Sequence, residues 1–190
     1  MNYFWNTIQD NFGYTNLEIR RIQYFLKAIG GDISKLGILF FLYLTMGKTW
    51  EYLISVFVLL TLRGFSGGVH MKHYWSCLLC TLLVLSLSIC ILPMLPIPMY
   101  LAPVIICICS IITFVIGPIP SNRRPIITED SWKKFRIKAI TVLCVYLITS
   151  LLFPDYKYLD IVVWTIVVQT LQLILTNIFQ KGDRYEKATG

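Results

Sequence analysis

The stretch YWSCLLCTLLVLSLSICIL, residues 74–92, decides the fold, because it holds no charged side chain over the length of a membrane crossing. It belongs to a longer segment, residues 73–122, that contains no Asp, Glu, Lys or Arg. One transmembrane helix needs about 20 apolar residues, so this segment has room for two. The cluster Pro93, Pro96 and Pro98 predicts the turn between them. Contiguous rather than alternating hydrophobicity favours helices over strands.

The composition extends this interpretation to the whole chain. Of 190 residues, 56% are hydrophobic and 14% are charged, against about 25% charged in soluble domains. A water-soluble domain, a disordered chain, a collagen and a coiled coil are excluded. The net charge of +7 would suit a nucleic-acid partner if taken alone, but the apolar composition excludes one. All six cysteines lie in or beside apolar runs, so we expect free thiols rather than disulfides.

The N-terminal part predicts a helix of a different kind. Residues 15–29 combine an apolar stripe with a basic face at helical spacing, which is typical of a helix lying in the membrane interface. Gly30 and Gly31 are expected to end it. As a single helix, the apolar stretch 33–62 would measure about 45 Å, too long for a membrane core of about 30 Å. Two short crossings joined at residues 47–51 fit better.

Further crossings are predicted at 99–117, 135–153 and 159–179. We therefore predict an all-α fold, a polytopic integral membrane protein with about six transmembrane helices and an N-terminal interfacial amphipathic helix. The expected organisation is an amphipathic N-terminal segment 1–32, a transmembrane helical domain 33–180 with cytoplasmic loops 63–73 and 118–138, and a cytoplasmic tail 181–190.

The distribution of lysine and arginine predicts the orientation. With six crossings, 15 of the 17 basic residues share one side, and only Lys48 and Lys157 lie opposite. If residues 33–62 cross once, the division becomes 11 against 6. The positive-inside rule therefore favours the hairpin and places the basic side, with both termini, in the cytoplasm. The expected location is the cell membrane.

The segment RGFSGGVHMKHYWSC, residues 63–77, is the richest in groups that can do chemistry. It holds His70, His73 and Cys77, and a cysteine nucleophile needs a base or cation that favours its thiolate. Three interpretations remain open from the residues alone: simple packing, a zinc site completed by Cys80, and a catalytic Cys/His pair. In a continuous helix His73 would lie one turn from Cys77, whereas His70 would need a bend to reach it.

The last predicted crossing carries a polar stripe at helical spacing, formed by Thr165, Gln169, Gln172 and Thr176. Polar side chains inside a membrane are costly, so they indicate a role. Hydrogen bonding between helices is the favoured interpretation, and a substrate groove is the alternative.

The pattern Arg63-x3-Gly67-Gly68-x-His70-x6-Cys77, between an apolar hairpin and a long apolar helix, resembles the AgrB family, accessory gene regulator protein B. The resemblance extends to the opening Met-Asn-Tyr-Phe, to PIPSNRRPI and to the total length. Members are membrane endopeptidases that process the AgrD propeptide into a cyclic autoinducing peptide. The resemblance implies that His70 and Cys77 are catalytic, without a metal or a cofactor.

We therefore expect Cys77, activated by His70, to form an acyl-thioester with a propeptide that is then cyclised to a thiolactone or lactone. Arg63 and the backbone near Gly67 and Gly68 are candidates for oxyanion or orienting groups. The expected partners are an AgrD-like propeptide, membrane lipid and a second copy of the chain in a homodimer. Candidates for binding an acidic propeptide tail, or anionic lipid, are Arg123, Arg124, Lys133 and Lys134.

Two functions from other classes compete. A small transporter or exporter subunit for a peptide would suit the polar stripe, but it would need membrane-embedded ionisable groups or repeated halves, which the sequence lacks. A non-catalytic membrane scaffold would tolerate replacement of Cys77.

Overall fold

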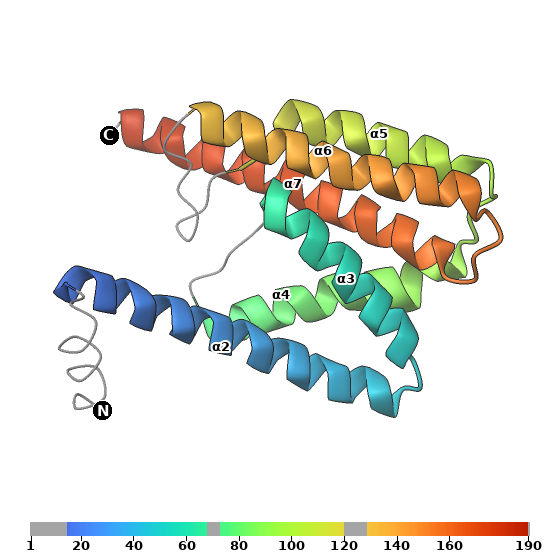
Figure 1. Ribbon diagram of the computed structural model, residues 1–190, viewed down its shortest axis with the longest axis horizontal. Coiled ribbons are helices and arrows are strands. Elements are labelled where there is room, and N and C mark those ends of the chain that lie inside the picture. The colour runs from blue at the N-terminus through green and yellow to red at the C-terminus, as the bar shows by residue number, and fades with distance from the viewer. Residues whose placement is uncertain (1–14, 68–72, 120–128, 190) are drawn as a thin grey trace. The chain divides into compact units, whose positions relative to one another are not determined.

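The computed structural model describes residues 15–67, 73–119 and 129–189, and the elements in these ranges are helices (Figure 1). The predicted all-α class is confirmed. The chain divides into two units, Met1–Gly47 and Lys48–Gly190, which are described in turn.

The described part of the first unit is one helix, α2 (Asn16–Thr45). A capping box begins it. The Glu18 backbone N–H donates to Thr15 Oγ1 at 3.4 Å, and the Thr15 backbone N–H donates to the Glu18 carboxylate at 2.9 Å. These two bonds satisfy backbone donors that the first turn of a helix otherwise leaves unpaired, and the helix therefore begins where the sequence predicts it.

Helix α2 runs through Gly30 and Gly31, so the prediction that these glycines end it is wrong. A glycine ends a helix by adopting a positive φ, and neither of them does. Each costs about 1 kcal/mol relative to alanine inside a helix, too little to interrupt a long one. Lys35 Nζ lies 3.0 Å from Asp32 Oδ1, and this pair, three residues apart, stabilises the continuing helix.

Gly47 separates α2 from the next helix, α3 (Thr49–Ser66), which confirms the predicted break. Its φ of +68° lies in the left-handed region, where glycine has no steric penalty. The apolar stretch 33–62 is thus two helices and not one.

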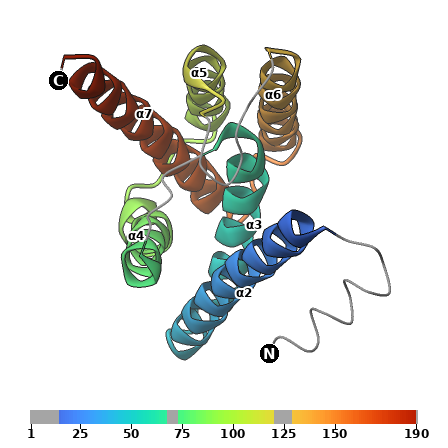
Figure 2. The ribbon, with the colours of Figure 1, turned by 90° about the vertical axis from the view of Figure 1, so that its left-hand side faces the viewer.

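The second unit contains α3 and four further long helices. In order these are α4 (Tyr74–Ser86), α5 (Leu101–Ile116), α6 (Glu129–Leu152) and α7 (Leu159–Thr189). Helix α7 packs against α3, α4 and α5, and α6 packs against α3 and α5 (Figure 2). The last turns of α3 and α5 and the first turns of α4 and α6 lie at the same end of the helices (Figure 1).

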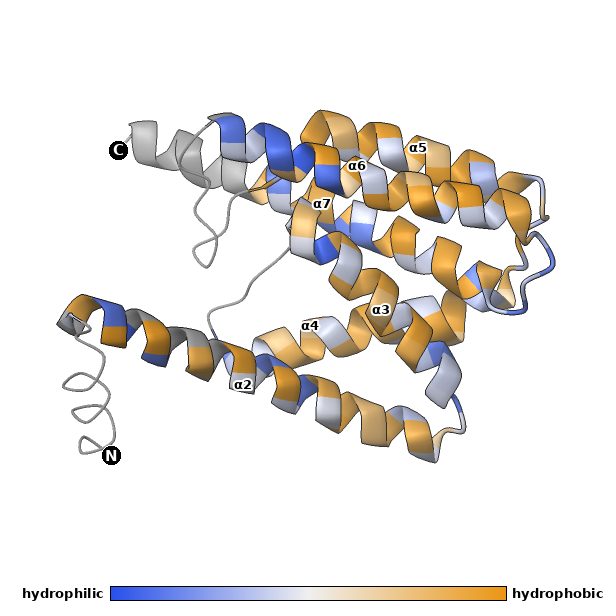
Figure 3. Cartoon of the chain, viewed as in Figure 1, coloured by the Kyte–Doolittle hydropathy of each residue, from blue (hydrophilic) through white to orange (hydrophobic). Residues whose placement is uncertain are grey.

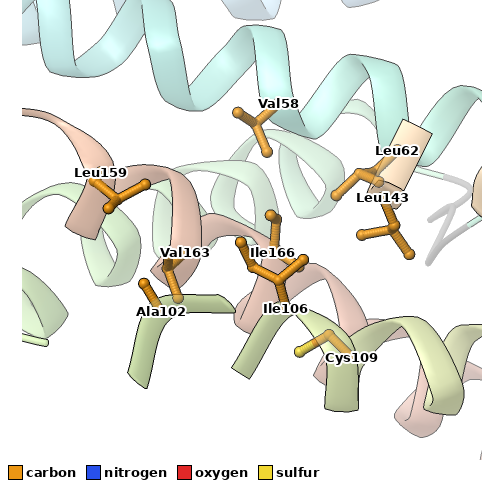
Figure 4. Packing of buried hydrophobic residues seen from close by; sticks show 9 residues of the cluster. All are labelled: Val58, Leu62, Ala102, Ile106, Cys109, Leu143, Leu159, Val163 and Ile166. Carbon is orange, nitrogen blue, oxygen red and sulfur yellow. The ribbon is translucent and has the colours of Figure 1, made fainter. Parts of the chain in front are cut away.

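The core of this unit lies where α3, α5, α6 and α7 meet (Figure 4). Ala102 and Ile106 of α5 and Val163 and Ile166 of α7 are fully buried. Lipid tails are as apolar as these side chains, so close packing rather than removal from water holds membrane helices together. The complete cluster is Val58, Leu62, Ala102, Ile106, Cys109, Leu143, Leu159, Val163 and Ile166.

Three helical segments are long and apolar enough to cross a membrane: Tyr74–Met94, Asp130–Leu152 and Leu159–Phe179. Helix α5 is apolar but shorter, at 16 residues, or about 24 Å. Large apolar side chains are exposed along these helices, and Figure 3 shows polar residues gathered at the start of α6. The chain is therefore a membrane protein. That α3 and the second half of α2 also cross, for about six crossings in all, stays a prediction.

Helix α4 continues through a π-helical turn, Leu87–Ile91, and a 3-10 turn, Leu92–Met94. The Ile89 carbonyl in the widened turn accepts a hydrogen bond from Lys48 Nζ at 3.4 Å. Trp164 Nε1 of α7 donates to the Leu95 carbonyl at 3.3 Å. The residue that precedes α3 thus pairs with a carbonyl of the π-helical turn, and a side chain of α7 pairs with one in the proline-rich turn that follows.

Candidate functional site

Arg63 lies in the last turn of α3, because the helix continues to Ser66. The loop predicted to begin at residue 63 therefore begins at Gly67. The Gly67 N–H donates to the Arg63 carbonyl at 3.2 Å, and its φ of +86° turns the chain out of the helix. Both residues of this pair were predicted as site residues, and the structure places them at one helix end.

Gly67 packs directly against the chain that follows α5. A Cβ atom at this position would lie 2.7 Å from the Ile119 carbonyl oxygen, closer than real Cβ atoms approach. The Ile119 N–H donates to the Ser66 carbonyl at 3.1 Å. Close backbone approach and positive φ together require glycine here.

A side chain of α7 reaches the same glycine. Gln169, which is 2% exposed, donates from Nε2 to the Gly67 carbonyl at 3.0 Å. Another member of the polar stripe, Thr165, pairs with Ser55 of α3 at 2.9 Å, a hydrogen bond between helices as the favoured interpretation predicts, whereas Gln169 bonds to the residue that follows α3. The sequence did not predict that Gln169 would bond to the backbone carbonyl of Gly67, which is itself a predicted site residue.

Cys77 lies at the start of α4, the helix that begins at Tyr74. Its backbone N–H donates to the His73 carbonyl at 3.1 Å, and its side chain is buried, with 6% exposed. His73 is the exposed residue before the first turn, with extended backbone (φ −94°, ψ 139°). His73 thus caps α4 and lies one helical turn before Cys77, although its own backbone is extended rather than helical.

The ends of α3 and α4 bring Arg63 toward the cysteines. The Cys80 thiol lies within range of the Arg63 charge and also beside Cys77. Arg63 in the last turn of α3 and the two cysteines in the first turns of α4 thus lie at the same end of these helices (Figure 1).

Two of the four predicted tail-binding residues are described. Lys133 and Lys134 are exposed on α6, which begins at Glu129, so the predicted loop 118–138 is helical over its last ten residues. The remaining predicted site residues lie outside the described ranges: His70, Gly68, Arg123 and Arg124.

Arg136 has a role that the sequence did not reveal. Its Nε and Nη2 groups both donate to the Phe114 carbonyl, with the Nε–oxygen distance at 2.7 Å. Its guanidinium also lies 4.2 Å from the ring centroids of Phe114 and Trp132. Trp132 Nε1 in turn donates to the Pro118 carbonyl at 3.2 Å. Arg136 therefore donates to a carbonyl that the last turn of α5 would otherwise leave unpaired. This contact connects α6 to the end of α5.

Neither a disulfide nor a metal cluster appears in the described residues. All six cysteines are free, as predicted. No three His, Cys, Asp or Glu side chains gather closely enough to hold a metal ion in the ranges described. The zinc interpretation includes His70, which lies outside these ranges.

A separate apolar cavity of about 490 Å³ lies between α3, α6 and α7. Trp50, Phe57, Phe153 and Tyr156 are among its lining residues. The α3 residues that line the cavity belong to the first half of that helix, whereas Gly67 follows its last turn. The cavity is therefore distinct from the group around Gly67 and Cys77.

These features define a helical membrane protein in which a buried cysteine at the start of one helix and an arginine at the end of another lie at the same end of the helices. The family described as Accessory gene regulator B matches residues 1–173, so the chain belongs to the AgrB family. Membership ties it to the accessory gene regulator quorum-sensing system.

Similar proteins occur in clostridia. A chain of Clostridium beijerinckii named "Putative AgrB-like protein" is 28% identical over 172 residues, which is 89% of this chain and 83% of its own length. A chain of the same name from Clostridium perfringens strain SM101 is 27% identical over 155 residues, 76% of this chain and 71% of its own. No solved structure matches this protein.

Proposed function

We propose that this protein is a membrane-embedded cysteine endopeptidase that removes the C-terminal part of an AgrD-like quorum-sensing propeptide and promotes cyclisation of the remainder. The observation that carries the proposal is the buried Cys77 in the first turn of α4, at the same end of the helices as the last turn of α3, which carries Arg63 (Figure 1). Family membership supports the same chemistry.

His70 is the proposed base. Helix α4 begins at Tyr74, after both histidines, and His73 is the exposed residue at its cap, one turn before Cys77. The family pattern assigns the role to His70. Gly67 starts the connection to His70 from a position fixed by Ile119 and Gln169.

The first step transfers the acyl group. His70 takes the thiol proton, and the Cys77 thiolate attacks the carbonyl carbon of the scissile peptide bond. The C–N bond then breaks, the leaving amine takes the proton from the imidazolium, and a thioester joins Cys77 to the N-terminal fragment. Arg63 and the backbone near Gly67 and Gly68 are the proposed groups that stabilise the intermediate oxyanion.

The second step closes the ring. A thiol within the bound fragment gives its proton to His70 and attacks the thioester carbonyl carbon. The bond to Cys77 then breaks, the Cys77 thiolate takes the proton back from His70, and a thiolactone forms, whereas a serine hydroxyl would form a lactone. Exchange of one thioester for another is nearly balanced in energy, so exclusion of water favours cyclisation over hydrolysis. The burial of Cys77 suits this requirement.

The proposed location is the cell membrane, with several crossings and the site on the cytoplasmic side. In support, the ends of α3 and α4 that carry Arg63 and Cys77 share their end of the molecule with the basic start of α6 (Figure 1). Arg123, Arg124, Lys133 and Lys134 are the proposed partners of an acidic propeptide tail or of anionic lipid. A homodimer is the proposed assembly.

The test is cleavage of the co-expressed propeptide by single variants. We expect Cys77→Ala and His70→Ala each to lower cleavage by about 1,000-fold or more without changing membrane insertion. Cys90→Ser and Cys107→Ser are the matched cysteine controls and should retain wild-type activity. Normal cleavage by Cys77→Ala would favour the peptide exporter or the scaffold instead, and an active His70→Ala beside an inactive His73→Ala would move the base to His73.

A further inference from the structure

The apolar cavity of about 490 Å³ between α3, α6 and α7 opens on the surface of the helix bundle, because many of its lining side chains are exposed. Phe57 of α3 and Val145 of α6 are among these exposed apolar residues. Ligand sites in proteins have volumes of about 300–1,000 Å³ and mostly apolar linings. The cavity therefore has the size and the chemistry of a site for an apolar molecule.

The cavity extends along one half of the membrane-crossing helices. Its lining on α3 runs from Trp50 to Val58, and its lining at the end of α6 runs from Val145 to Phe153. Each stretch measures about 12 Å, close to the depth of one leaflet, which is half of a membrane core of about 30 Å. The start of α3, the end of α6 and the start of α7 lie at the same end of the helices (Figure 1). The cavity thus reaches from that end to about the middle of the membrane.

Two aromatic residues lie at the mouth of the cavity. Trp50 in the first turn of α3 and Tyr156 in the connection between α6 and α7 both line it, and both are exposed. Tryptophan and tyrosine are enriched where the hydrocarbon core of a membrane meets the lipid head groups. The mouth therefore faces the head-group region, and the interior of the cavity faces the hydrocarbon.

The hydroxyl groups deeper in the lining are already paired within the protein. Thr149 and Ser150 each donate to a backbone carbonyl of the preceding turn at 2.8 Å. The Tyr146 hydroxyl pairs with Thr61 Oγ1 at 2.9 Å. A polar occupant would lose its hydrogen bonds to water without gaining free partners in return, whereas a hydrocarbon loses none.

Other occupants suit the cavity less well. A helix with its side chains is about 10 Å across, so 12 Å of its length takes up roughly 900 Å³, well above the cavity volume of about 490 Å³. An anionic head group finds no surplus of positive charge at the mouth, because acidic residues accompany the lysines of the adjoining sequence: Lys48, Glu51, Asp155, Lys157 and Asp160.

We propose that this cavity binds one acyl chain of a membrane phospholipid. The acyl chain enters beside Trp50 and Tyr156 and ends near Val58 and Val145. It supplies contacts that the lining otherwise lacks and so stabilises the packing of α3 against α6. The acyl chain, and not the charge of the head group, determines binding. The site is separate from Cys77 and does not depend on the proposed peptidase chemistry.

The test is native mass spectrometry of the full-length protein, extracted with mild detergent from vesicles of phosphatidylglycerol or of phosphatidylcholine with the same acyl chains. Thr149→Trp and Val145→Trp each place a large ring in the cavity. Ile148→Trp is the matched control, because Ile148 is exposed on the same helix outside the cavity lining. Thr149→Val removes only the hydroxyl group. Thermal midpoints are measured with and without added phospholipid.

We expect the wild type, Ile148→Trp and Thr149→Val to retain a bound phospholipid from either kind of vesicle. Thr149→Trp and Val145→Trp should lose it. Added phospholipid should raise the thermal midpoint of the wild type by several degrees, since a ligand that binds only the folded state stabilises it. The midpoints of the two cavity variants should not respond.

A wild type without bound phospholipid, or equal retention by Thr149→Trp and Ile148→Trp, would overturn the proposal. Retention from phosphatidylglycerol vesicles alone would replace it with a head-group site. A dimer that Thr149→Trp converts to a monomer would assign the cavity to a second copy of the chain. Val145→Trp decides between these outcomes if Thr149→Trp fails to fold.

Discussion

The Ile119 carbonyl oxygen occupies the space in which a side chain on Gly67 would lie, 2.7 Å from the site of its Cβ atom. The end of α3 and the chain after α5 are thus in backbone contact at the residue that leads to His70. A site residue implied by family resemblance therefore has a steric explanation in the fold.

The first prediction is that Gly67→Ala destabilises the protein and abolishes cleavage. A left-handed backbone costs a residue with a Cβ about 1–2 kcal/mol, and the contact with Ile119 adds to this. Gly64→Ala is the matched control, because a Cβ there meets nothing within 4 Å and alanine is favoured in a helix by about 1 kcal/mol. Thermal midpoints and cleavage rates check both. Equal behaviour of the two variants would refute the steric explanation.

The second prediction concerns Arg136. Arg136→Lys keeps the charge and hence the topology, but it loses the two-pronged bond to the Phe114 carbonyl and the stacking on two rings. Hydrogen bonds from charged groups contribute about 1.5–3 kcal/mol, so we expect a thermal midpoint lower by several degrees. Lys134→Arg, on the exposed surface of the same helix, is the control and should leave the midpoint unchanged. An unchanged midpoint in Arg136→Lys would show that the tie to α5 contributes nothing.

The third prediction is that reversing charge at Lys133 and Lys134 raises KM for the propeptide and leaves kcat nearly unchanged. These side chains are exposed, so their attraction for an acidic tail is screened by salt over about 8–10 Å. Wild-type KM should therefore rise with ionic strength, and the variant should respond less. Lys157→Glu, in the connection between α6 and α7, is the control. With topology preserved, an unchanged KM would leave these lysines only an anchoring role.

The fourth prediction is sidedness. In a protein whose native cysteines are replaced, Lys133→Cys should react with a membrane-impermeant maleimide only in inside-out vesicles. Lys157→Cys should react only in intact cells, because one crossing, α6, separates the two positions. Both side chains are exposed, so access depends on the side of the membrane. Reaction of Lys133→Cys from outside would reverse the proposed orientation.

Local signals predicted much of the fold. The break at Gly47 was predictable because a polar interruption divides a stretch too long for one crossing. The break at Gly30 and Gly31 was predicted wrongly, since glycine ends a helix only where its φ becomes positive and the surrounding helical pattern did not stop. The start of α6 lies earlier than expected because polar residues can extend a membrane helix beyond the apolar core.

The site was predicted less completely. Arg63, Gly67 and Cys77 follow from a sequence pattern, and the structure places them on the ends of neighbouring helices. The contacts of Gln169 and Arg136 could not be predicted, because each joins residues distant in the chain and depends on how the helices pack. The polar stripe on α7 indicated that Gln169 forms a hydrogen bond outside its own helix, but it did not indicate that the acceptor is the Gly67 carbonyl.

The acyl-thioester on Cys77 is the central claim, and intact-protein mass spectrometry tests it most directly. Wild-type protein is mixed with the propeptide, quenched in acid at early times and digested to locate the adduct. The account predicts a mass increase equal to the N-terminal fragment on the Cys77 peptide, removed by hydroxylamine and absent from Cys77→Ala. Cleavage and cyclisation at full rate without any adduct on Cys77, or by Cys77→Ala itself, would contradict it.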